Sequence, residues 1–184
     1  LGLPFYAVGG CVRDWLLGRS TFDLDVTVVG DPDPIAGLCA RILGGSAESF
    51  GRFGTRRVIG RGRFRVDVAT TRSETYPEPA ALPELTAVKV PIEVDLFRRD
   101  FTINALAVRL DDGSRGLVDP YGGLRDLKDR TLRVLHPASF RDDPTRVFRA
   151  ARFLARLRYK PAAGMTDEAK DALSRGHAAK LSRH

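Results

Sequence analysis

Residues 6–29 read YAVGGCVRDWLLGRSTFDLDVTVV, an order that predicts a strand, a glycine turn, a helix and a second strand. The apolar start ends at Gly9 and Gly10, and residues 11–17 then have the spacing of apolar side chains that is typical of a helix. Residues 22–29 alternate between polar and apolar side chains, as a half-buried strand does, and one face of that strand is acidic.

Asp23 and Asp25 stand at positions i and i+2 of the second strand, so their carboxylates share one face, roughly 7 Å apart. Like charges this close repel each other, and a bound divalent cation relieves the repulsion. Because only oxygen ligands are on offer, Mg²⁺ is the expected metal. Gly9 and Gly10 lead into a helix whose first amides suit a triphosphate, with Arg13 one turn further on. The alternatives are a solvated pair of aspartates and an ordinary glycine turn.

Asp67 lies in the segment RVDVAT between two valines, and it could add a third carboxylate to the same metals. The alternative is a surface residue of an alternating strand. Three carboxylates and two metal ions fit an in-line displacement at phosphorus. The residues therefore predict a nucleotidyl transfer site.

The rest of the chain predicts a mixed sheet with further helices. Strands are expected at residues 56–59, 64–69 and 107–110, and helices at residues 34–43, 97–106, 144–159 and from 161 to the end. Residues 75–91 contain four prolines, which predicts an irregular loop. Asp143 and Pro144 are suited to begin the helix that follows them.

The chain has 184 residues, the size of one domain or of one domain and the start of a second. Its 43% hydrophobic and 29% charged residues argue against wholesale disorder and fibrous repeats. No apolar run approaches the ~18 residues that a membrane span needs, and the start has no secretory-signal pattern. Cys11 and Cys39 fit a reducing compartment, so we expect a cytoplasmic protein without membrane contact.

The net charge of +7 is unevenly distributed along the chain. Residues 125–184 contain 15 Lys and Arg against 7 Asp and Glu, whereas residues 1–124 contain 15 against 16. A basic C-terminal third suits contact with phosphates, while the N-terminal part holds the acidic chemistry. The alternative is a solvated basic face.

Four runs of sequence resemble, in their order, the bacterial-type (class II) tRNA nucleotidyltransferase and poly(A) polymerase family. They are AVGGCVRDWLLGRSTFDLDV (7–26), FRRDFTINALAV (97–108), VDPYGGLRDLKDRTLR (118–133) and DDPTRVFRAARFLARL (142–157). The resemblance implies an α/β (α+β) fold: a nucleotidyltransferase head with a mixed five-stranded sheet, followed by the start of a helical neck. We expect the head over residues 1–135 and the neck over 136–184, in a chain that is truncated relative to the family.

The resemblance also implies roles for individual residues. Gly9, Gly10 and Arg13 resemble the triphosphate contacts, Asp23 and Asp25 the metal ligands, Asp67 the third acidic position and Arg99 a nucleotide-binding arginine. Asp100 and Asn104 of the same run support either the ribose or the fold; as a structural alternative, Asp100 would cap a helix.

Asp143 and Arg146 are three residues apart and can project toward one ligand from adjacent helical turns. The family uses this pair as a template for the base. Cytosine and adenine offer an amino donor beside a ring-nitrogen acceptor, which matches a carboxylate beside a guanidinium, whereas guanine and uracil present the reverse pattern. Arg149 and Arg152 continue the stripe as further phosphate or base contacts. The competing interpretation makes Asp143 a helix cap and the arginines a solvated face.

The expected function is addition of C, A or both to the 3′ end of tRNA, from CTP or ATP, with Mg²⁺ and release of pyrophosphate. A poly(A) polymerase of the same family is the nearest alternative, and a non-catalytic RNA-binding remnant is a more distant one.

Two departures from the family matter. Asp142 stands where Glu is usual, and residues 76–95 lack a Gly/Arg-rich composition, which leaves the choice between C and A open.

Overall fold

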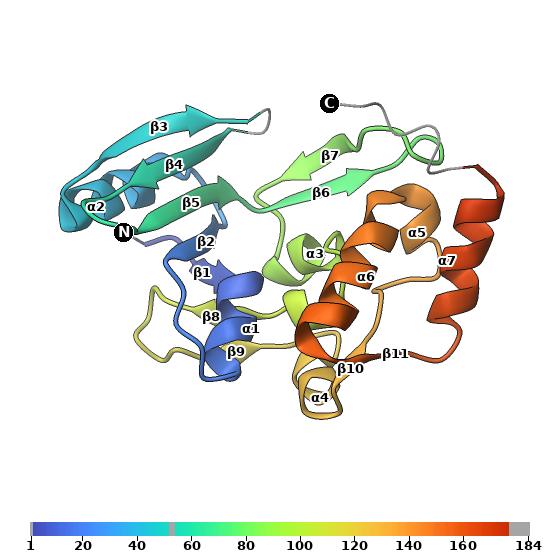
Figure 1. Ribbon diagram of the computed structural model, residues 1–184. Helices are drawn as coiled ribbons and strands as arrows, with labels where there is room; N and C mark the ends of the chain where they lie inside the picture. The colour runs from blue at the N-terminus through green and yellow to red at the C-terminus, as the bar shows by residue number, and fades with distance from the viewer. Residues whose placement is uncertain (1, 52–53, 177–184) are drawn as a thin grey trace.

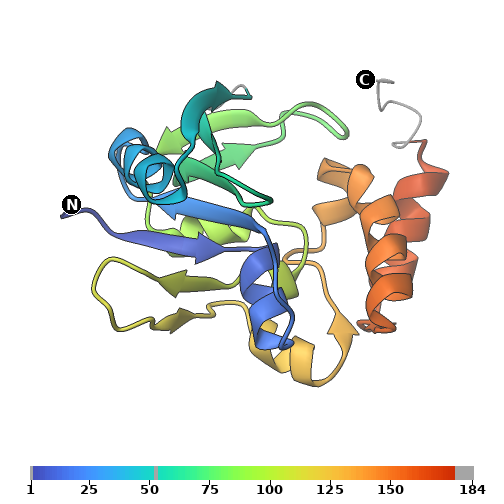
Figure 2. The ribbon, with the colours of Figure 1, turned by 60° about the vertical axis from the view of Figure 1, so that its left-hand side comes forward.

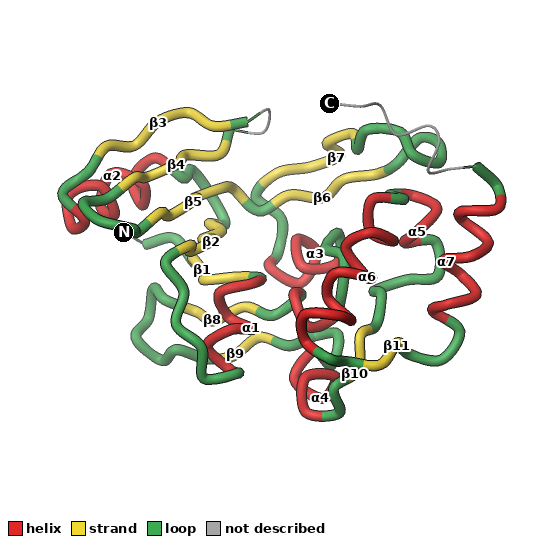
Figure 3. Tube along the Cα trace, viewed as in Figure 1, coloured by secondary structure: helices red, strands yellow, loops and turns green. Residues whose placement is uncertain are grey.

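The computed structural model describes residues 2–51 and 54–176, in which strands are interspersed with helices (Figures 1 and 3). The strands are β1 (Phe5–Val8), β2 (Asp23–Val28), β3 (Ser46–Phe50), β4 (Thr55–Ile59), β5 (Arg65–Thr70), β6 (Arg72–Thr75), β7 (Glu84–Val88), β8 (Ala107–Arg109), β9 (Leu117–Val118), β10 (Thr131–Leu132) and β11 (Lys160–Pro161). The helices are α1 (Gly10–Leu16), α2 (Asp33–Leu43), α3 (Ile92–Phe97), α4 (Gly123–Lys128), α5 (Ser139–Asp142), α6 (Thr145–Leu157) and α7 (Met165–Ser174), with one 3₁₀ turn, η1 (Thr102–Asn104).

The main sheet has the strand order β3-β4-β5-β2-β1-β8-β9. Strands β2 and β5 are parallel and the other neighbours are antiparallel, which confirms the predicted mixed sheet and the α/β class. The sheet has seven strands rather than the five that the resemblance implied, because β3 and β9 extend its two edges.

The alternation of β2 separates an apolar face of the sheet from an acidic one. Val26 and Val28 are buried against helix α2, together with valines of β4 and β5. Asp23 and Asp25 therefore lie on the opposite face, because successive side chains of a strand point to opposite sides. Helix α3 covers part of that opposite face, where its Leu96 packs with the β1 residues Tyr6 and Val8.

Helices α5, α6 and α7 form a helical part beside the sheet (Figure 2). One apolar core joins the two, since Phe101, Leu132 and Val12 pack in the same cluster as Phe153 of α6 and Met165 of α7. This packing fixes α6 against α1 and η1 and so brings widely separated parts of the sequence together.

The prediction of an irregular loop over residues 75–91 is wrong in part. Strand β7 lies within this range and pairs with β6 in an antiparallel hairpin. The prolines do not prevent this pairing, because three of them lie in the connection between the strands and Pro91 precedes α3. The ELTAV segment of β7 is left free of proline.

The helix predicted over residues 97–106 is also wrong. Helix α3 ends at Phe97, where the prediction began it, and Pro91 precedes its first turn. Beyond it, Phe101 is extended and bridges Val134, and the Asp100 carboxylate accepts hydrogen bonds from the Phe101 amide and the Asn104 side chain. Such local bonds to the side chain compete with helix formation.

The other predicted elements are confirmed within one or two residues, as comparison with β1, α1, β2, α2, β4, β5, β8 and α6 shows. Helix α7 accounts for part of the predicted helix after residue 161, whose end, residues 177–184, lies outside the described residues. Across the described residues, we find no helix with the length and apolar character needed to cross a bilayer.

Candidate functional site

A polar cavity of about 420 Å³ lies between the sheet and helix α6. Nine of the eleven predicted site residues line it: Gly9, Gly10, Arg13, Asp25, Arg99, Asp143, Arg146, Arg149 and Arg152. A second cavity of about 330 Å³ shares Asp25 and Arg99 with the first and is lined by Asp67. Asp23 lines neither of these two cavities. A larger cavity of about 560 Å³, between α5 and α7, contains none of the predicted residues.

The glycine turn brings the backbone of Gly9 against Arg99. Gly9 has φ 75° and ψ −131°, and a Cβ atom there would lie 2.7 Å from Nη1 of Arg99 and 3.7 Å from Oδ2 of Asp25. Only glycine adopts this conformation readily, so the turn allows the guanidinium to approach the strand end. The amides that follow start helix α1 and have no helical acceptor of their own.

The three predicted carboxylates lie on one sheet face, but their partners differ. Asp25 and Asp67 are paired positions of the parallel strands β2 and β5. The Asp67 carboxylate accepts two hydrogen bonds from Arg57, at 2.8 and 2.7 Å. Asp23 forms an ion pair of 3.1 Å with Arg65. Within residues 2–51 and 54–176, no hydrogen bond or ion pair reaches the carboxylate of Asp25.

The charge environment of Asp25 is mixed. Its side chain is exposed to the cavity, yet the protein around the carboxyl removes enough water that desolvation raises its pKa. Arg99 and Arg65 oppose this shift, whereas Asp67 and Asp23 add to it. A cation bound beside Asp25 would therefore relieve both the desolvation and the repulsion.

Within the described ranges, no three acidic, histidine or cysteine side chains gather closely enough to hold a metal ion together. Both oxygens of Asp67 accept hydrogen bonds from Arg57. The oxygens of Asp25, with those of Asp23 two residues away on the same face, still match the hard oxygen ligands that Mg²⁺ or Mn²⁺ prefers. The donor set thus fits a divalent cation held by two carboxylates.

A hydrogen-bonded relay joins α6 to α1 along one wall of the cavity. Arg149 donates to Asp100 at 2.8 Å, and Asp100 accepts from the side chain of Asn104 at 2.9 Å. Asn104 in turn accepts from Arg13 at 2.6 Å, and Arg13 also pairs with Asp14. Arg13 is buried, so its charge is fixed beside Gly10 by these partners.

Arg146 is buried and held from several sides at the end of the cavity. It donates to Ser139 at 2.7 Å and to the backbone carbonyl of Arg98 at 2.9 Å, and its Nε lies 3.5 Å from Oδ2 of Asp143. The other oxygen of Asp143 accepts from the amide and hydroxyl of Thr145. Asp143 therefore bonds the first residue of helix α6 and also faces Arg146. The N-cap of α6 is Pro144, one residue after the predicted cap at Asp143.

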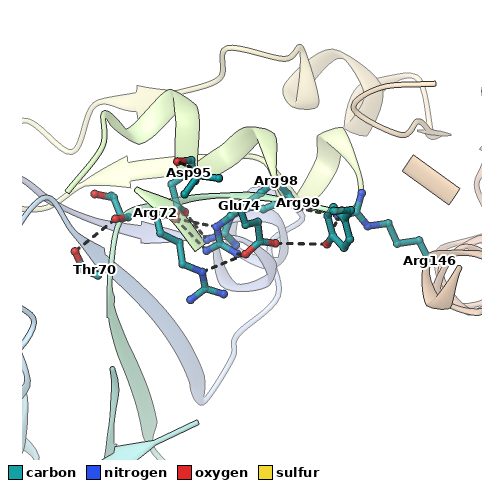
Figure 4. Close-up of polar contacts among 11 residues, drawn as sticks. Thr70, Arg72, Glu74, Asp95, Arg98, Arg99 and Arg146 are labelled. Atoms are coloured by element: carbon teal, nitrogen blue, oxygen red, sulfur yellow. Dashed lines mark hydrogen bonds and ion pairs between the residues drawn. The ribbon is translucent and has the colours of Figure 1, made fainter. Parts of the chain in front are cut away.

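Sequence reasoning missed a charged cluster on β6 and α3 that supports these residues (Figure 4). Asp95 is fully buried and accepts hydrogen bonds from Arg98, Arg99 and the amide of Arg72. Glu74 pairs with Arg72 at 3.2 Å and with Arg98 at 3.8 Å. The i, i+3 and i, i+4 spacing of Asp95 with the two arginines was a usable signal, whereas the contacts to β6 depend on the hairpin.

Two further residues of α6 line the cavity without having been predicted. Arg156 follows Arg152 by one helical turn, and both side chains are exposed. Phe153 is buried, and the guanidinium of Arg13 lies 5.2 Å from its ring centroid. Arg156 extends the predicted basic stripe and could have been found from its helical spacing.

Comparison with known proteins places this geometry in a family. The family described as Poly A polymerase head domain matches residues 5–133. An A-adding tRNA nucleotidyltransferase of Geobacter sulfurreducens is 46% identical over 182 residues, which cover 98% of this chain and 20% of that protein. A CC-adding tRNA nucleotidyltransferase of Deinococcus radiodurans is 41% identical over 171 residues, which cover 91% of this chain and 44% of that protein.

A solved structure shows the same fold in a relative. It is a tRNA nucleotidyltransferase complexed with a primer tRNA and an incoming ATP analog, with a TM-score of 0.85 and 39% identity, over 99% of this chain and 50% of that one. The chain thus spans half or less of the length of each of these relatives. The glycine turn, the acidic strand face and the match over residues 5–133 agree, and the chain belongs to the Poly A polymerase head domain family.

Proposed function

We propose that this chain carries the catalytic head, residues 1–135, and the start of the helical neck, residues 136–184, of a tRNA 3′-end nucleotidyltransferase. The reaction adds C, A or both from CTP or ATP and releases pyrophosphate. The single observation that carries the proposal is the cavity in which the glycine turn, the arginines of α6 and the carboxylate of Asp25 meet, a carboxylate that has no ion pair among the described residues.

Asp25 and Asp23 would hold Mg²⁺, which supplies neutralisation of phosphate charge and activation of the attacking 3′-hydroxyl. The amides after Gly9 and the guanidinium of Arg99 orient the triphosphate. The Nε atom of Arg99 is buried and has no hydrogen-bond partner among the described residues, so this side chain has capacity to bind a phosphate oxygen. Arg13 adds fixed positive charge next to Gly10.

Several further residues would complete the site. Asp67 lines the neighbouring cavity with both oxygens bonded to Arg57, so it would assist activation of the primer hydroxyl through its charge and not as a metal ligand. Arg149 and Arg152 are exposed on the same wall and would contact phosphates or the base. Asp143 and Arg146 would read the base by the donor and acceptor pattern that cytosine and adenine share. A mismatched base would leave buried groups unpaired, at about 1–3 kcal/mol per group.

The proposed RNA partner is the 3′ end of tRNA. Relatives are named as A-adding and CC-adding tRNA nucleotidyltransferases, and one solved relative contains a primer tRNA. We propose a cytoplasmic location, with which the two free cysteines are compatible. The family description favours a second candidate function, that of a poly(A) polymerase, which shares the same head.

The test is an incorporation assay with CTP alone, ATP alone and both. Three tRNA substrates, ending before the CCA, after its two C residues and after the complete CCA, are compared with a generic RNA. We expect incorporation that requires Mg²⁺ and stops on the complete end, and that falls by at least about a hundredfold in Asp25→Asn while the circular dichroism spectrum is unchanged. Preference for generic RNA with open-ended A addition would favour the poly(A) polymerase. Absence of incorporation on every RNA would leave a binding module.

A further inference from the structure

Arg57 on β4 is bonded to Asp67, a contact that the sequence did not predict. It stands opposite Asp67 in the antiparallel register of β4 and β5. Its Nε and Nη2 donate to the two different oxygens of Asp67, at 2.8 and 2.7 Å. On its other side, the guanidinium carbon lies 3.2 Å from the ring centroid of Phe50. The two hydrogen bonds to Asp67 and the contact with the Phe50 ring together fix the orientation of the Arg57 guanidinium.

Arg57 interacts electrostatically with all three predicted carboxylates, Asp67, Asp23 and Asp25. The hydrogen bonds to Asp67 raise the pKa of Arg57, and the charges of Asp67, Asp23 and Asp25 contribute in the same direction. Arg57 is bonded to Asp67 and lies near enough to Asp23 and Asp25 for their charges to act on it. Asp23 is engaged by Arg65, so Asp25 is the one carboxylate of the three without a guanidinium bonded to it within the described residues.

We infer that Arg57 is a positioning residue that serves as a built-in counter-ion for Asp67. It keeps both oxygens of Asp67 turned toward β4 and leaves cation binding to Asp25 and Asp23. The inference rests on the proposed metal site. It fits two observations together: Asp25 and Asp67 are paired positions of neighbouring strands, and yet both oxygens of Asp67 are bonded to Arg57 on the next strand.

A purely structural role for Arg57 makes a different prediction. A cross-strand ion pair would stabilise the sheet slightly and leave cation affinity unchanged, because partly exposed ion pairs contribute little to stability. The side chains of Arg57 and Asp67 are 22% and 20% exposed, so they form a pair of this partly exposed kind. Cation affinity is therefore the quantity that separates the two roles.

The adjacent residue Arg56 provides a matched control. It lies on the same strand but on the opposite face, and it forms an ion pair of 2.6 Å with Asp33. Replacing Arg56 removes the same charge and a comparable ion pair without touching Asp67. Any difference between the two substitutions reports on the carboxylate face and not on the net charge of the protein.

The experiment is a titration of the protein with Mn²⁺, followed by electron paramagnetic resonance, without nucleotide or RNA. The variants are Arg57→Gln, Arg57→Lys, Arg56→Gln and the double variant Arg57→Gln/Asp67→Asn. Removal of one nearby positive charge and release of a carboxylate should tighten Mn²⁺ binding about tenfold in Arg57→Gln. Arg57→Lys, which keeps the charge without the paired geometry, should give a smaller gain. Arg56→Gln should bind as the unmodified protein does.

The double variant identifies the cause of the gain. If Arg57 acts by holding Asp67, adding Asp67→Asn should return Mn²⁺ affinity close to that of the unmodified protein. Unchanged or weaker binding in Arg57→Gln would overturn the inference, as would a gain that persists in the double variant or an absence of Mn²⁺ binding in every form. Thermal melting confirms that each variant folds. If Arg57→Gln does not fold, the Mn²⁺ affinity of Arg57→Lys is compared with that of the unmodified protein instead. A Mn²⁺ response of this kind without nucleotide incorporation would refute the proposed function alone.

Discussion

Gly9 has a positive φ, which residues with a side chain disfavour, and its backbone lies close to Arg99. We expect Gly9→Ala to lower the free energy of unfolding by about 1–3 kcal/mol, because of its positive φ, and to displace Arg99, whose Nη1 would lie 2.7 Å from the new Cβ. Nucleotide incorporation should fall as well. Urea denaturation and the incorporation assay measure the two effects.

Gly18 supplies the control for this substitution. It also has a positive φ, 69°, but a Cβ there would meet no atom within 4 Å. Gly18→Ala should therefore cost stability, about 1–2 kcal/mol, without loss of incorporation. Equal losses of incorporation in the two variants would show that the contact with Arg99 is unimportant.

His136 gives the protein a predictable response to acid. Burial and the charge of Arg146 lower its pKa below the usual 6.5, against the opposing effect of Asp142. The folded state therefore prefers the neutral ring, and this preference favours folding fully above pH 6.5 and is lost as the pH falls below that value. We expect His136→Asn to reduce the loss of stability between pH 7 and pH 5, measured by urea denaturation at both values. An equal loss in both proteins would show that other groups govern this range.

The residues of the site differ in how far the sequence could predict them. Asp25, Arg99 and Arg146, which line the cavity, could be predicted because each lies in a run of sequence that resembles the family. Arg57 and Asp95 were not, because their importance comes from partners on other strands and helices. A single sequence carries no information about which arginine will stand opposite which aspartate once the register is set.

Asp100 links the 3₁₀ turn η1 to helix α6. It accepts bonds from the Phe101 amide, the Asn104 side chain and Arg149. We expect Asp100→Ala to cost about 2–4 kcal/mol of unfolding free energy, because it leaves buried donors unsatisfied. The exposed pair of Asp171 and Arg175 is the control, and Asp171→Ala should change stability by no more than about 0.5 kcal/mol. Equal effects in urea denaturation would contradict the structural role of the relay.

The elements with strong local patterns could be predicted, and those that depend on tertiary contacts could not. Strand β2 and helix α6 follow from alternation and helical spacing. Strand β3 is exposed throughout and has no apolar pattern, so its pairing with β4 had no signal. The hairpin of β6 and β7 was obscured by prolines that lie outside its pairing segments.

The folded protein gathers the unevenly distributed charge of the sequence around one cavity. The acidic strand face comes from the N-terminal part, and the arginines of α6 come from the basic C-terminal third. The sequence predicted both charges but left open whether the basic part was a solvated face. The shared core, which packs Phe153 of α6 against Phe101, places four arginines of that helix on the wall opposite the strand.

The fixed position of Arg146 has a consequence for how errors would be avoided. Its guanidinium is held by Ser139, the Arg98 carbonyl and Asp143, so its orientation is set by the protein itself. If Arg146 reads the base as proposed, a wrong base would meet a side chain that does not adapt to it, and rejection would need no closing motion of the protein. We expect the selectivity between bases to depend little on solvent viscosity, because a side chain that is already held in place rejects a wrong base without a slow rearrangement of the protein.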